Sequence, residues 1–460
     1  MTLSPGPLLP SGHERLRRWE RNVLLAFLFV AFAFGGRVLF MSAYDEVRRT
    51  DASVYFRTAW AFRTGEKIYE IPDDRGLHFA YPPVVSIFFV PLADAPENAP
   101  RDWMMPYPVT VVVWYLLGLL ATFLAVHWFA LAMEENARDP ALHKPPVDSR
   151  RWWYNRMLPI FICVAPIGAM LERGQVTPYL LLFVSRMFLA TVRGQSFRSG
   201  LWLAAAICLK VIPGLLLVFF AVRRDWRAWA GTVVGGLIGV VVIPTAVMGV
   251  DGAVEVHRQF IEGVIKPGLG AGGTKTLQDE MMSMRRPGSQ SIKAVIHNYQ
   301  FWDRETRPEL PNSITKYGHL AGAAILVGGL VLAFGWRRRT DAIDLLLFLG
   351  GLLTCMILIS PESHTHYFSV PMPLIMALTY RSMERRPAEL VPSYNLRLVF
   401  VVISIAFWFV MIPIWEMRRE AGITFWASSI LWGLALVRLR GERPVEEVQQ
   451  EQANEMVRAA

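Results

Sequence analysis

The chain is poor in charge and in cysteine. Charged residues make up 18% of its 460 residues, whereas about a quarter is usual for a soluble globular domain. Its three cysteines, Cys163, Cys208 and Cys355, each lie inside an apolar stretch, without Cys-x-x-Cys spacing. We interpret them as packing residues. These shortages exclude a cytosolic enzyme and a secreted disulfide scaffold.

Several functional motifs are also missing. The sequence has no Walker A loop, no G-x-G-x-x-G after a strand, no H-E-x-x-H and no G-x-S-x-G. It therefore carries no signature of ATP use, and no cofactor is expected. A net charge of +9 suggests nucleic acid in a soluble domain, but here the basic residues form short clusters beside apolar stretches. That arrangement is typical of topology signals, so no nucleic-acid partner is predicted.

Long apolar stretches make up much of the sequence. Hydrophobic residues make up 53% of the chain, and the mean hydropathy is +0.33. A bilayer core about 30 Å thick needs roughly 20 apolar residues per helix. The sequence therefore predicts an all-α, polytopic transmembrane bundle in contact with membrane lipids. The apolar blocks lie at 22–41, 81–93, 109–131, 157–171, 177–192, 200–222, 228–249, 318–336, 342–360, 367–380, 396–415 and 423–437.

Two of these blocks are expected not to cross as one span. Block 81–93 is short and contains three prolines, so it is predicted to dip in and return. Block 200–222 has basic residues at both ends, with Lys210 and Pro213 near its centre. Proline removes a backbone donor, which predicts a broken helix folded as a hairpin, its tip near the outer face. About ten full spans remain, and a cavity is expected at the two broken segments.

The basic clusters then fix the sides of the membrane. The N-terminal segment 1–21 and the polar tail 438–460 are predicted to be cytoplasmic, on either side of a membrane module at 22–437. Segments 42–80, 250–317 and 360–366 become outer loops, together with the turn 172–176. The glycine- and proline-rich segment 250–317 is expected to be a mobile loop. The first apolar stretch resembles a signal peptide, but its length favours a retained span.

Asp51 is the first candidate for chemistry. It follows the first span, and Tyr55 lies four residues later, on the same face of a helix. A carboxylate at the membrane surface can accept the proton of an acceptor hydroxyl. The alternative is a helix N-cap at Thr50 or Asp51, which the spacing alone favours over catalysis.

Lys210 and a histidine pair are the other candidates. A lysine amid apolar residues marks a functional pathway or a buried partner, and a phosphate is a natural ligand for it. The alternative is snorkelling to the surface from the hairpin tip. Glu362, His364 and His366 lie between two late spans. Two histidines without a third ligand are weak grounds for a metal, and a polar interfacial loop is the alternative.

The order of these motifs resembles glycosyltransferase family 87. The resemblance covers about residues 22–380 and rests on Asp51-x-x-x-Tyr55, Gly65-x-x-x-Tyr69, Tyr81-Pro82-Pro83, Pro91-Leu92-Ala93, Gly174-Gln175, Leu209-Lys210-x-x-Pro213, Arg223-Arg224-x-Trp226 and Ser289-Gln290-Ser291. Many relatives have asparagine where this chain has Ser289. The family contains membrane enzymes of the GT-C class, similar to the polyprenyl-phosphate-mannose-dependent α-mannosyltransferases of mycobacterial glycolipid synthesis.

The resemblance implies that a sugar moves, with inversion, from a polyprenyl-phosphate donor to a hydroxyl of a glycolipid or glycan. It implies an integral protein of the bacterial inner membrane whose active site faces the periplasm or exterior. The roles implied are base for Asp51, donor-phosphate binding for Lys210, His364 and His366, and substrate binding for Tyr55, Tyr81, Gln175, Gln290 and Ser291. No metal is implied. A transporter or flippase of a lipid-linked sugar is the competing interpretation, and a non-catalytic envelope scaffold is a second.

Overall fold

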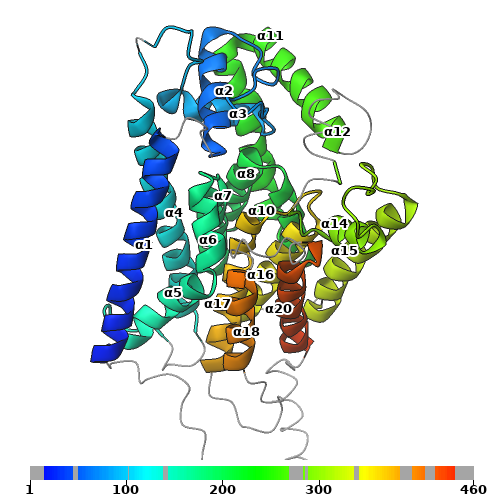
Figure 1. Ribbon diagram of the computed structural model, residues 1–460. Helices are drawn as coiled ribbons and strands as arrows, with labels where there is room; N and C mark the ends of the chain where they lie inside the picture. Colours follow the sequence, from blue (N-terminus) through cyan, green and yellow to red (C-terminus); the bar gives the residue numbers. More distant parts are fainter. Residues whose placement is uncertain are drawn as a thin grey trace, which may run out of the picture.

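The computed structural model describes residues 15–44, 50–101, 103–137, 143–268, 283–284, 288–335, 341–383, 396–409 and 420–440. Within these ranges the chain forms helices, and its only β-type contact is an isolated bridge between Arg15 and Ser149. This confirms the predicted all-α class. Most of the predicted N-terminal segment and polar tail lies outside the described residues. Figure 1 shows an elongated bundle with smaller helices gathered at one end.

Five described helical stretches are long and apolar enough to cross a membrane. A sixth is counted if the bent pair α5 (Arg150–Ile162) and α6 (Val164–Glu172) is one span. The prediction of about ten spans therefore goes beyond these, and the number of spans stays a prediction. The five are α1 (Arg18–Tyr44), α4 (Tyr107–Glu135), the stretch Trp226–Gly268, which is kinked at Gly249, α15 (Ser313–Phe334) and α16 (Ala342–Ile359).

The core of the bundle is built around α16. Almost all of its residues are buried, whereas α1 exposes most of its apolar side chains. Helices α15, α17 (Met372–Met383) and α20 (Ile423–Arg440) pack against α16, and Figure 1 shows α16 behind them. α1 instead packs along α4 at the edge of the molecule, in the place of a lipid-facing helix. α18 (Leu396–Phe409) packs against α20 and α5.

The predicted break in block 200–222 is confirmed. Helix α8 (Ser196–Leu209) ends at Lys210, whose backbone is extended at φ −155° and ψ 132°. A 3₁₀ turn at Ile212–Leu216 contains Pro213 and leads into α9 (Leu217–Val222). α10 (Trp226–Leu237) then runs parallel to α8, because Gly200 lies beside Ala228 and Gly239 lies beside Cys208. The chain has therefore returned to the level where α8 began, and Lys210 is at the tip of a hairpin.

Block 81–93 likewise forms no span. It contains the seven-residue helix α3 (Pro83–Phe89), followed by a 3₁₀ turn at Val90–Leu92. Block 157–171 is predicted to be one of the full spans, and the structure shows a sharp bend in it. α5 and α6 meet at Cys163 with a bend of 68°. Pro166 explains the bend, because it has no N–H to donate to Ile162 and its ring would clash with that carbonyl.

The expectation of a mobile loop at 250–317 is wrong for much of its length. α10 continues through a π turn at Ile238–Val242 into α11 (Ile243–Phe260), which is kinked at Gly249, where φ is 74° and ψ is 172°. A second π turn at Ile261–Ile265 and α12 (Lys266–Gly268) follow. α14 (Ile292–Gln300) follows later. Charged pairs one turn apart, such as Glu255 with Arg258, stabilise this polar helix. The predicted outer loop 42–80 also contains a helix, α2 (Ala52–Thr64).

The remaining elements place the two ends of the bundle. α1 begins and α20 ends at the lower end in Figure 1, whereas α2, α3 and α11 lie at the upper end. α7 (Thr177–Val192) runs from the upper end towards the lower one and is linked to α8 by a short turn. The outer loops predicted from the sequence thus gather at one end of the molecule, at the hairpin tip of Lys210.

Candidate active site

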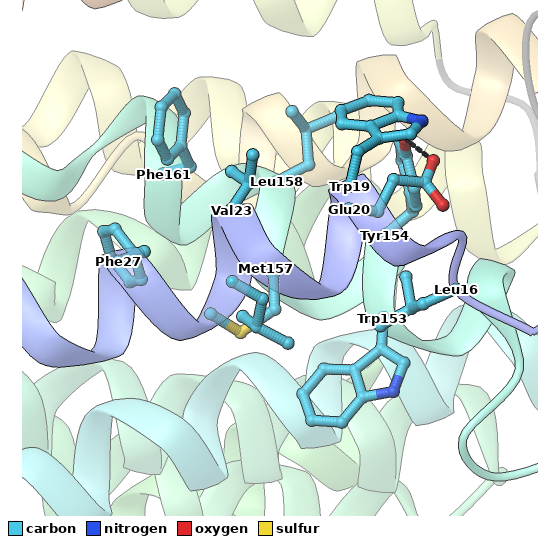
Figure 2. A pocket seen from close by; sticks show the side chains of 11 residues that line it. Leu16, Trp19, Glu20, Val23, Phe27, Trp153, Tyr154, Met157, Leu158 and Phe161 are labelled. Atoms are coloured by element: carbon cyan, nitrogen blue, oxygen red, sulfur yellow. Dashed lines mark hydrogen bonds between the residues drawn. The ribbon is translucent and has the colours of Figure 1, made fainter.

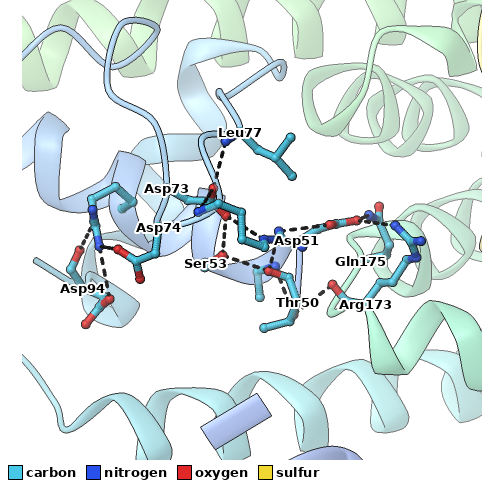
Figure 3. A network of polar contacts seen from close by, with 12 residues as sticks. Thr50, Asp51, Ser53, Asp73, Asp74, Leu77, Asp94, Arg173 and Gln175 are labelled. Carbon is cyan, nitrogen blue, oxygen red and sulfur yellow. Dashed lines mark hydrogen bonds and ion pairs between the residues drawn. The ribbon is translucent and has the colours of Figure 1, made fainter. Parts of the chain in front are cut away.

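Asp51 immediately precedes α2, but its side chain makes no capping bond to that helix. The hydroxyl of Thr50 accepts from the backbone N–H of Ala52 instead, at 3.2 Å. The capping alternative therefore holds for Thr50 and not for Asp51. One carboxylate oxygen of Asp51 accepts from Nε2 of Gln175 at 2.5 Å, and the other from a guanidinium N–H of Arg75 at 3.2 Å (Figure 3).

Arg75 is held by a second acid. Its Nε lies 3.2 Å from a carboxylate oxygen of Asp73, and its Nη2 also donates to the backbone oxygen of Thr50 at 2.8 Å. Asp73 is buried and accepts further bonds from the hydroxyl of Ser53 and the N–H of Leu77 (Figure 3). The chain turns at Asp73, since the N–H of Gly76 donates to its backbone oxygen, and this turn carries the arginine that contacts Asp51.

Arg173 approaches Asp51 from the turn after α6. Its Nη1 lies 3.7 Å from Asp51, and half of its side-chain surface is exposed. The backbone oxygen of Arg173 accepts from the hydroxyl of Thr50 and from the N–H of Asp51, at 2.9 and 2.7 Å. These bonds fix the turn that carries Gln175 against the start of α2, so the contact between Gln175 and Asp51 is built into the backbone.

Two tyrosines form the wall beside Asp51. The hydroxyl of Tyr55 lies 2.9 Å from that of Tyr81, and their rings meet edge to face at 5.1 Å. Burial raises the pKa of Tyr81 to about 12. Burial raises the pKa of Tyr55 well above its usual value, and the nearby Tyr81 and Asp51 add to the shift. Both phenols therefore stay protonated and are hydrogen-bond donors, not bases.

Lys210 faces the same wall from the hairpin tip. Its ammonium donates to the hydroxyl of Tyr367 at 2.7 Å and lies over the rings of Tyr367 and Tyr81, 4.1 and 5.6 Å from their centroids. In the described part of the chain no carboxylate pairs with Lys210. Lys210 and Tyr367 line a small cavity together with Thr177 and Ser360. The contacts with Tyr81 and Tyr367 show that the side chain points into the protein, which argues against snorkelling.

The histidine loop, residues 360–366, lies next to Tyr367. His364 pairs with Glu362, with 3.3 Å between Nε2 and Oε2. His366 is only 2% exposed, and among the described residues neither of its ring nitrogens has a hydrogen-bond partner. Burial lowers the pKa of His366 well below its usual value, and the neighbouring His364, Arg173 and Lys210 lower it further. His366 is therefore neutral and has a free N–H to offer.

Gln290 and Ser291 lie behind this loop and are fully buried. The N–H of Gln290 donates to the backbone oxygen of Ser363 at 2.7 Å, and its side-chain oxygen accepts from the N–H and the hydroxyl of Thr424. The hydroxyl of Ser291 caps α14. Gln290 and Ser291 thus join the histidine loop to α14 and α20. Nε2 of Gln290 has no hydrogen-bond partner among the described residues, and direct contact of these two residues with substrate stays a prediction.

An apolar groove begins at the same place. It lies among α3, α8, α10 and α11, and it is lined almost wholly by apolar surface. Cys208 and Val211, which flank Lys210, line it, and so do Pro82 and Pro83, which follow Tyr81. The groove therefore meets the polar site from the lipid side, as the sequence predicted for the two broken segments.

The site also contains residues to which the sequence analysis gave no role in it. Arg75, Arg173 and Tyr367 all contact predicted site residues. Tyr367 and Arg173 stand beside predicted residues in the sequence, and that proximity was the only available signal. Among the described residues, no group of three or more His, Cys, Asp or Glu side chains is placed to hold a metal ion.

Comparisons with known proteins agree with the motifs. Two curated relatives are named polyprenol-phosphate-mannose-dependent alpha-(1-2)-phosphatidylinositol mannoside mannosyltransferases. The one from Mycobacterium tuberculosis is 28% identical over 189 residues, covering 39% of this chain and 41% of the relative. The one from Mycolicibacterium smegmatis is 28% identical over 236 residues, covering 48% and 49%. The chain thus spans less than half the length of the relatives it matches.

This chain also matches a solved structure and the sequence model of a family. The crystal structure of ArnT from Cupriavidus metallidurans in the apo state aligns with 92% of this chain and 78% of its own, at 14% identity and a TM-score of 0.39. That likeness is too low to support an argument. The sequence model of glycosyltransferase family 87 matches residues 79–361, more than half of the chain. This chain therefore belongs to glycosyltransferase family 87.

Proposed function

We propose that this integral membrane protein is a glycosyltransferase that moves a hexose, most simply mannose, from a polyprenyl-phosphate sugar to a hydroxyl group. One observation carries the proposal. The carboxylate of Asp51 and the ammonium of Lys210, which pairs with no carboxylate of the described residues, lie on either side of two buried tyrosines, next to an apolar groove. A base, a cation for phosphate and a place for a lipid are the three things this reaction requires.

The phosphate of the donor belongs at Lys210. The lysine needs an anion or water at this depth, and its present partner, the phenol of Tyr367, can remain as a second donor. The free N–H of His366 and the half-exposed guanidinium of Arg173 lie on the adjoining side. Positive charge at this place stabilises the negative charge that develops on the leaving phosphate. His364 is nearby but is engaged by Glu362.

The sugar then lies between Lys210 and Asp51. The acceptor hydroxyl attacks the anomeric carbon, the bond from that carbon to the phosphate oxygen breaks, and polyprenyl phosphate leaves with the electron pair. Asp51 takes the proton of the attacking hydroxyl. Gln175 and Arg75 hold the two carboxylate oxygens in place, and the phenols of Tyr55 and Tyr81 are donors for sugar hydroxyls. Attack from the side opposite the phosphate inverts the anomeric centre.

The apolar groove is the place for the donor's lipid tail. It starts beside Lys210 and is bounded by α10 and the π turn that follows it, from which the exposed side chains of Val233 and Val240 line the groove. A tail bound there would leave its phosphate at the hairpin tip. The burial of isoprene units supplies affinity at about 25 cal/mol per Å² of apolar surface.

The acceptor and the side of the membrane follow from the relatives and from the charge pattern. The names of the relatives indicate a mannosylated glycolipid, so we propose a glycolipid or a related glycan as acceptor. The start of α1, with the exposed arginines Arg15, Arg17, Arg18 and Arg21, lies at the end of the bundle opposite the site, and we call this the Arg-rich end. Its charge supports an active site at the outer face of a bacterial inner membrane. Family membership gives no support to the transporter or flippase alternative.

Transfer by the purified protein tests the proposal. Wild-type protein is incubated with polyprenyl-phosphate mannose and a short-chain phosphatidylinositol mannoside, and the product is detected by mass spectrometry. We expect a product with one added hexose. The Asp51→Asn variant should bind donor but transfer it about 10²-fold more slowly or worse, because the amide cannot accept the proton.

A matched variant guards against a general loss of structure. Glu70→Gln removes a carboxylate from the same region, but Glu70 is exposed and pairs only with Lys67 among the described residues. It should transfer at the wild-type rate. Asp51→Asn within a few-fold of wild type would remove Asp51 from the mechanism. Absence of transfer to any lipid or glycan acceptor, with donor bound, would overturn the proposed reaction.

A further inference from the structure

A second groove lies at the opposite end of the bundle from Asp51. It runs between the start of α1 and the length of α5 (Figure 2). Val23 and Phe27 line it on one side and Met157 and Phe161 on the other. The two helices are joined at both ends of the groove. The rings of Phe27 and Phe161 meet at 5.9 Å, and the carboxylate of Glu20 accepts from the hydroxyl of Tyr154 at 2.8 Å.

The side chains show that the groove opens to the lipid. Trp19 and Val23 are 57% and 52% exposed, although both are apolar and line the groove. α1 is a candidate membrane span, so the medium around it is hydrocarbon. Figure 2 places Trp19 and Trp153 at the Glu20 end. Tryptophan gathers at the level of lipid headgroups, so an acyl chain in the groove would place its phosphate at this end.

The charged residues at the Glu20 end of the groove determine which lipid headgroup can bind there. Arg15, Arg17, Arg18 and Arg21 are all exposed. The acid that lines the groove, Glu20, is already bonded to Nε of Arg150 at 2.7 Å and leaves no free negative charge. Asp148 is the acid next to Trp153, whose indole N–H it accepts at 2.8 Å. Four exposed arginines beside an apolar groove therefore favour an anionic lipid, whose headgroup has no positive group to balance the charge of its phosphate.

We propose that this groove binds an anionic phospholipid of the leaflet at the Arg-rich end. One acyl chain lies between α1 and α5, and the phosphate contacts Arg17 and Arg21, which flank the groove-lining turn of α1. Arg15 and Arg18 add to the attractive field. This lipid is neither donor nor acceptor, because it binds at the far end of the bundle from Asp51 and Lys210. The proposal does not depend on the proposed function.

The test uses full-length protein in detergent, titrated with phosphatidylglycerol or phosphatidylcholine and followed by native mass spectrometry. The protein is already folded, so the role of arginines in setting topology does not enter. We expect one phosphatidylglycerol to bind in preference to phosphatidylcholine. The triple variant Arg17→Gln/Arg18→Gln/Arg21→Gln should bind it at least about tenfold more weakly. Val23→Trp, which fills the groove, should also weaken binding.

Matched variants separate a site from general charge. Arg198, Arg224 and Arg227 are exposed arginines outside the groove, and Val234 is an exposed valine on α10. Their substitutions by Gln and by Trp should leave binding unchanged. Equal losses in both triple variants would show nonspecific attraction and overturn the proposal. Equal binding of phosphatidylcholine, or full binding by Val23→Trp, would overturn it as well.

Discussion

Arg75 stands between two carboxylates, and its position determines its contribution. Asp73 anchors the guanidinium, while Asp51 receives one of its N–H groups. None of the described contacts of Arg75 is with a residue assigned to the leaving phosphate. We therefore assign Arg75 the role of positioning the base, Asp51. We expect Arg75→Gln to lower kcat about tenfold or more while leaving the KM for the donor nearly unchanged, because a misplaced base slows the chemical step.

The control for Arg75 is Lys67→Gln. Lys67 is an exposed cation in the same region, paired with Glu70 at 2.9 Å. It should behave as wild type. If Arg75→Gln raises the donor KM and leaves kcat intact, Arg75 contacts the donor and does not position Asp51. Steady-state kinetics at several donor concentrations distinguish these outcomes.

His366 provides a pH prediction. Because burial keeps the pKa of its imidazole well below the usual value, His366 is neutral across about pH 6 to 8, where an ordinary histidine would lose its charge. It therefore donates an N–H without being a cation. His366→Leu should reduce transfer by roughly tenfold through the loss of this donor. His366→Gln keeps an N–H donor and should retain most of the activity, with a pH profile of the wild-type shape over this range.

The pH dependence of the donor KM in the wild-type enzyme distinguishes a neutral His366 from a charged one. If His366 bound the donor phosphate as an imidazolium, the donor KM would rise with pH in wild type as the ring lost its proton, and it would be flat in His366→Gln. Donor KM measured at half-unit steps across the range would show this. Such a pattern would contradict the neutral histidine.

The contact between α8 and α10 holds the hairpin tip in position. The two helices approach closely at glycines, and a methyl group at Gly231 would collide with the backbone oxygen of Phe197. Gly231→Ala should therefore destabilise the protein by about 1–3 kcal/mol and lower its melting temperature in detergent. Gly236 lies on the same helix with nothing close to the position of an added methyl.

Gly236→Ala is thus the matched control. It should be neutral or slightly stabilising, because alanine favours a helix by up to about 1 kcal/mol over glycine. If both variants have the melting temperature of the wild type, α8 and α10 are farther apart than described. If both lose stability equally, the effect belongs to the helix and not to the contact with α8.

The elements also show what the sequence could reveal. Lys210 and Pro213 inside an apolar block indicated the hairpin correctly, because a charge and a missing N–H are each costly at that depth. The helix through Phe260 was missed, because its polar face looked like a loop and its stability comes from packing. Asp51 followed from its motif, but Arg75 did not, because the turn that brings it to Asp51 depends on the buried side chain of Asp73.

The whole molecule has a site end and an Arg-rich end, which predicts how the chain lies in the membrane. A single cysteine at Lys67, which follows α2 at the site end, should react with an impermeant maleimide added to intact spheroplasts. A single cysteine at Arg198, at the start of α8, should react only after the membrane is opened. Both positions are exposed. The native cysteines are buried and should give little background. Labelling of both positions from one side would contradict the proposed orientation.

α16 carries a consequence for how the protein is made. Its apolar composition allows it to enter the bilayer alone, yet in the finished protein it is enclosed by its neighbours. It must therefore exchange lipid for protein after insertion, and in a bilayer that exchange is driven by close packing and not by escape from water. α17 and α20, which cover it, are synthesised later. We therefore expect α16 to be inserted before the helices that complete its enclosure, so that a ribosome stalled before α20 would leave it in contact with lipid.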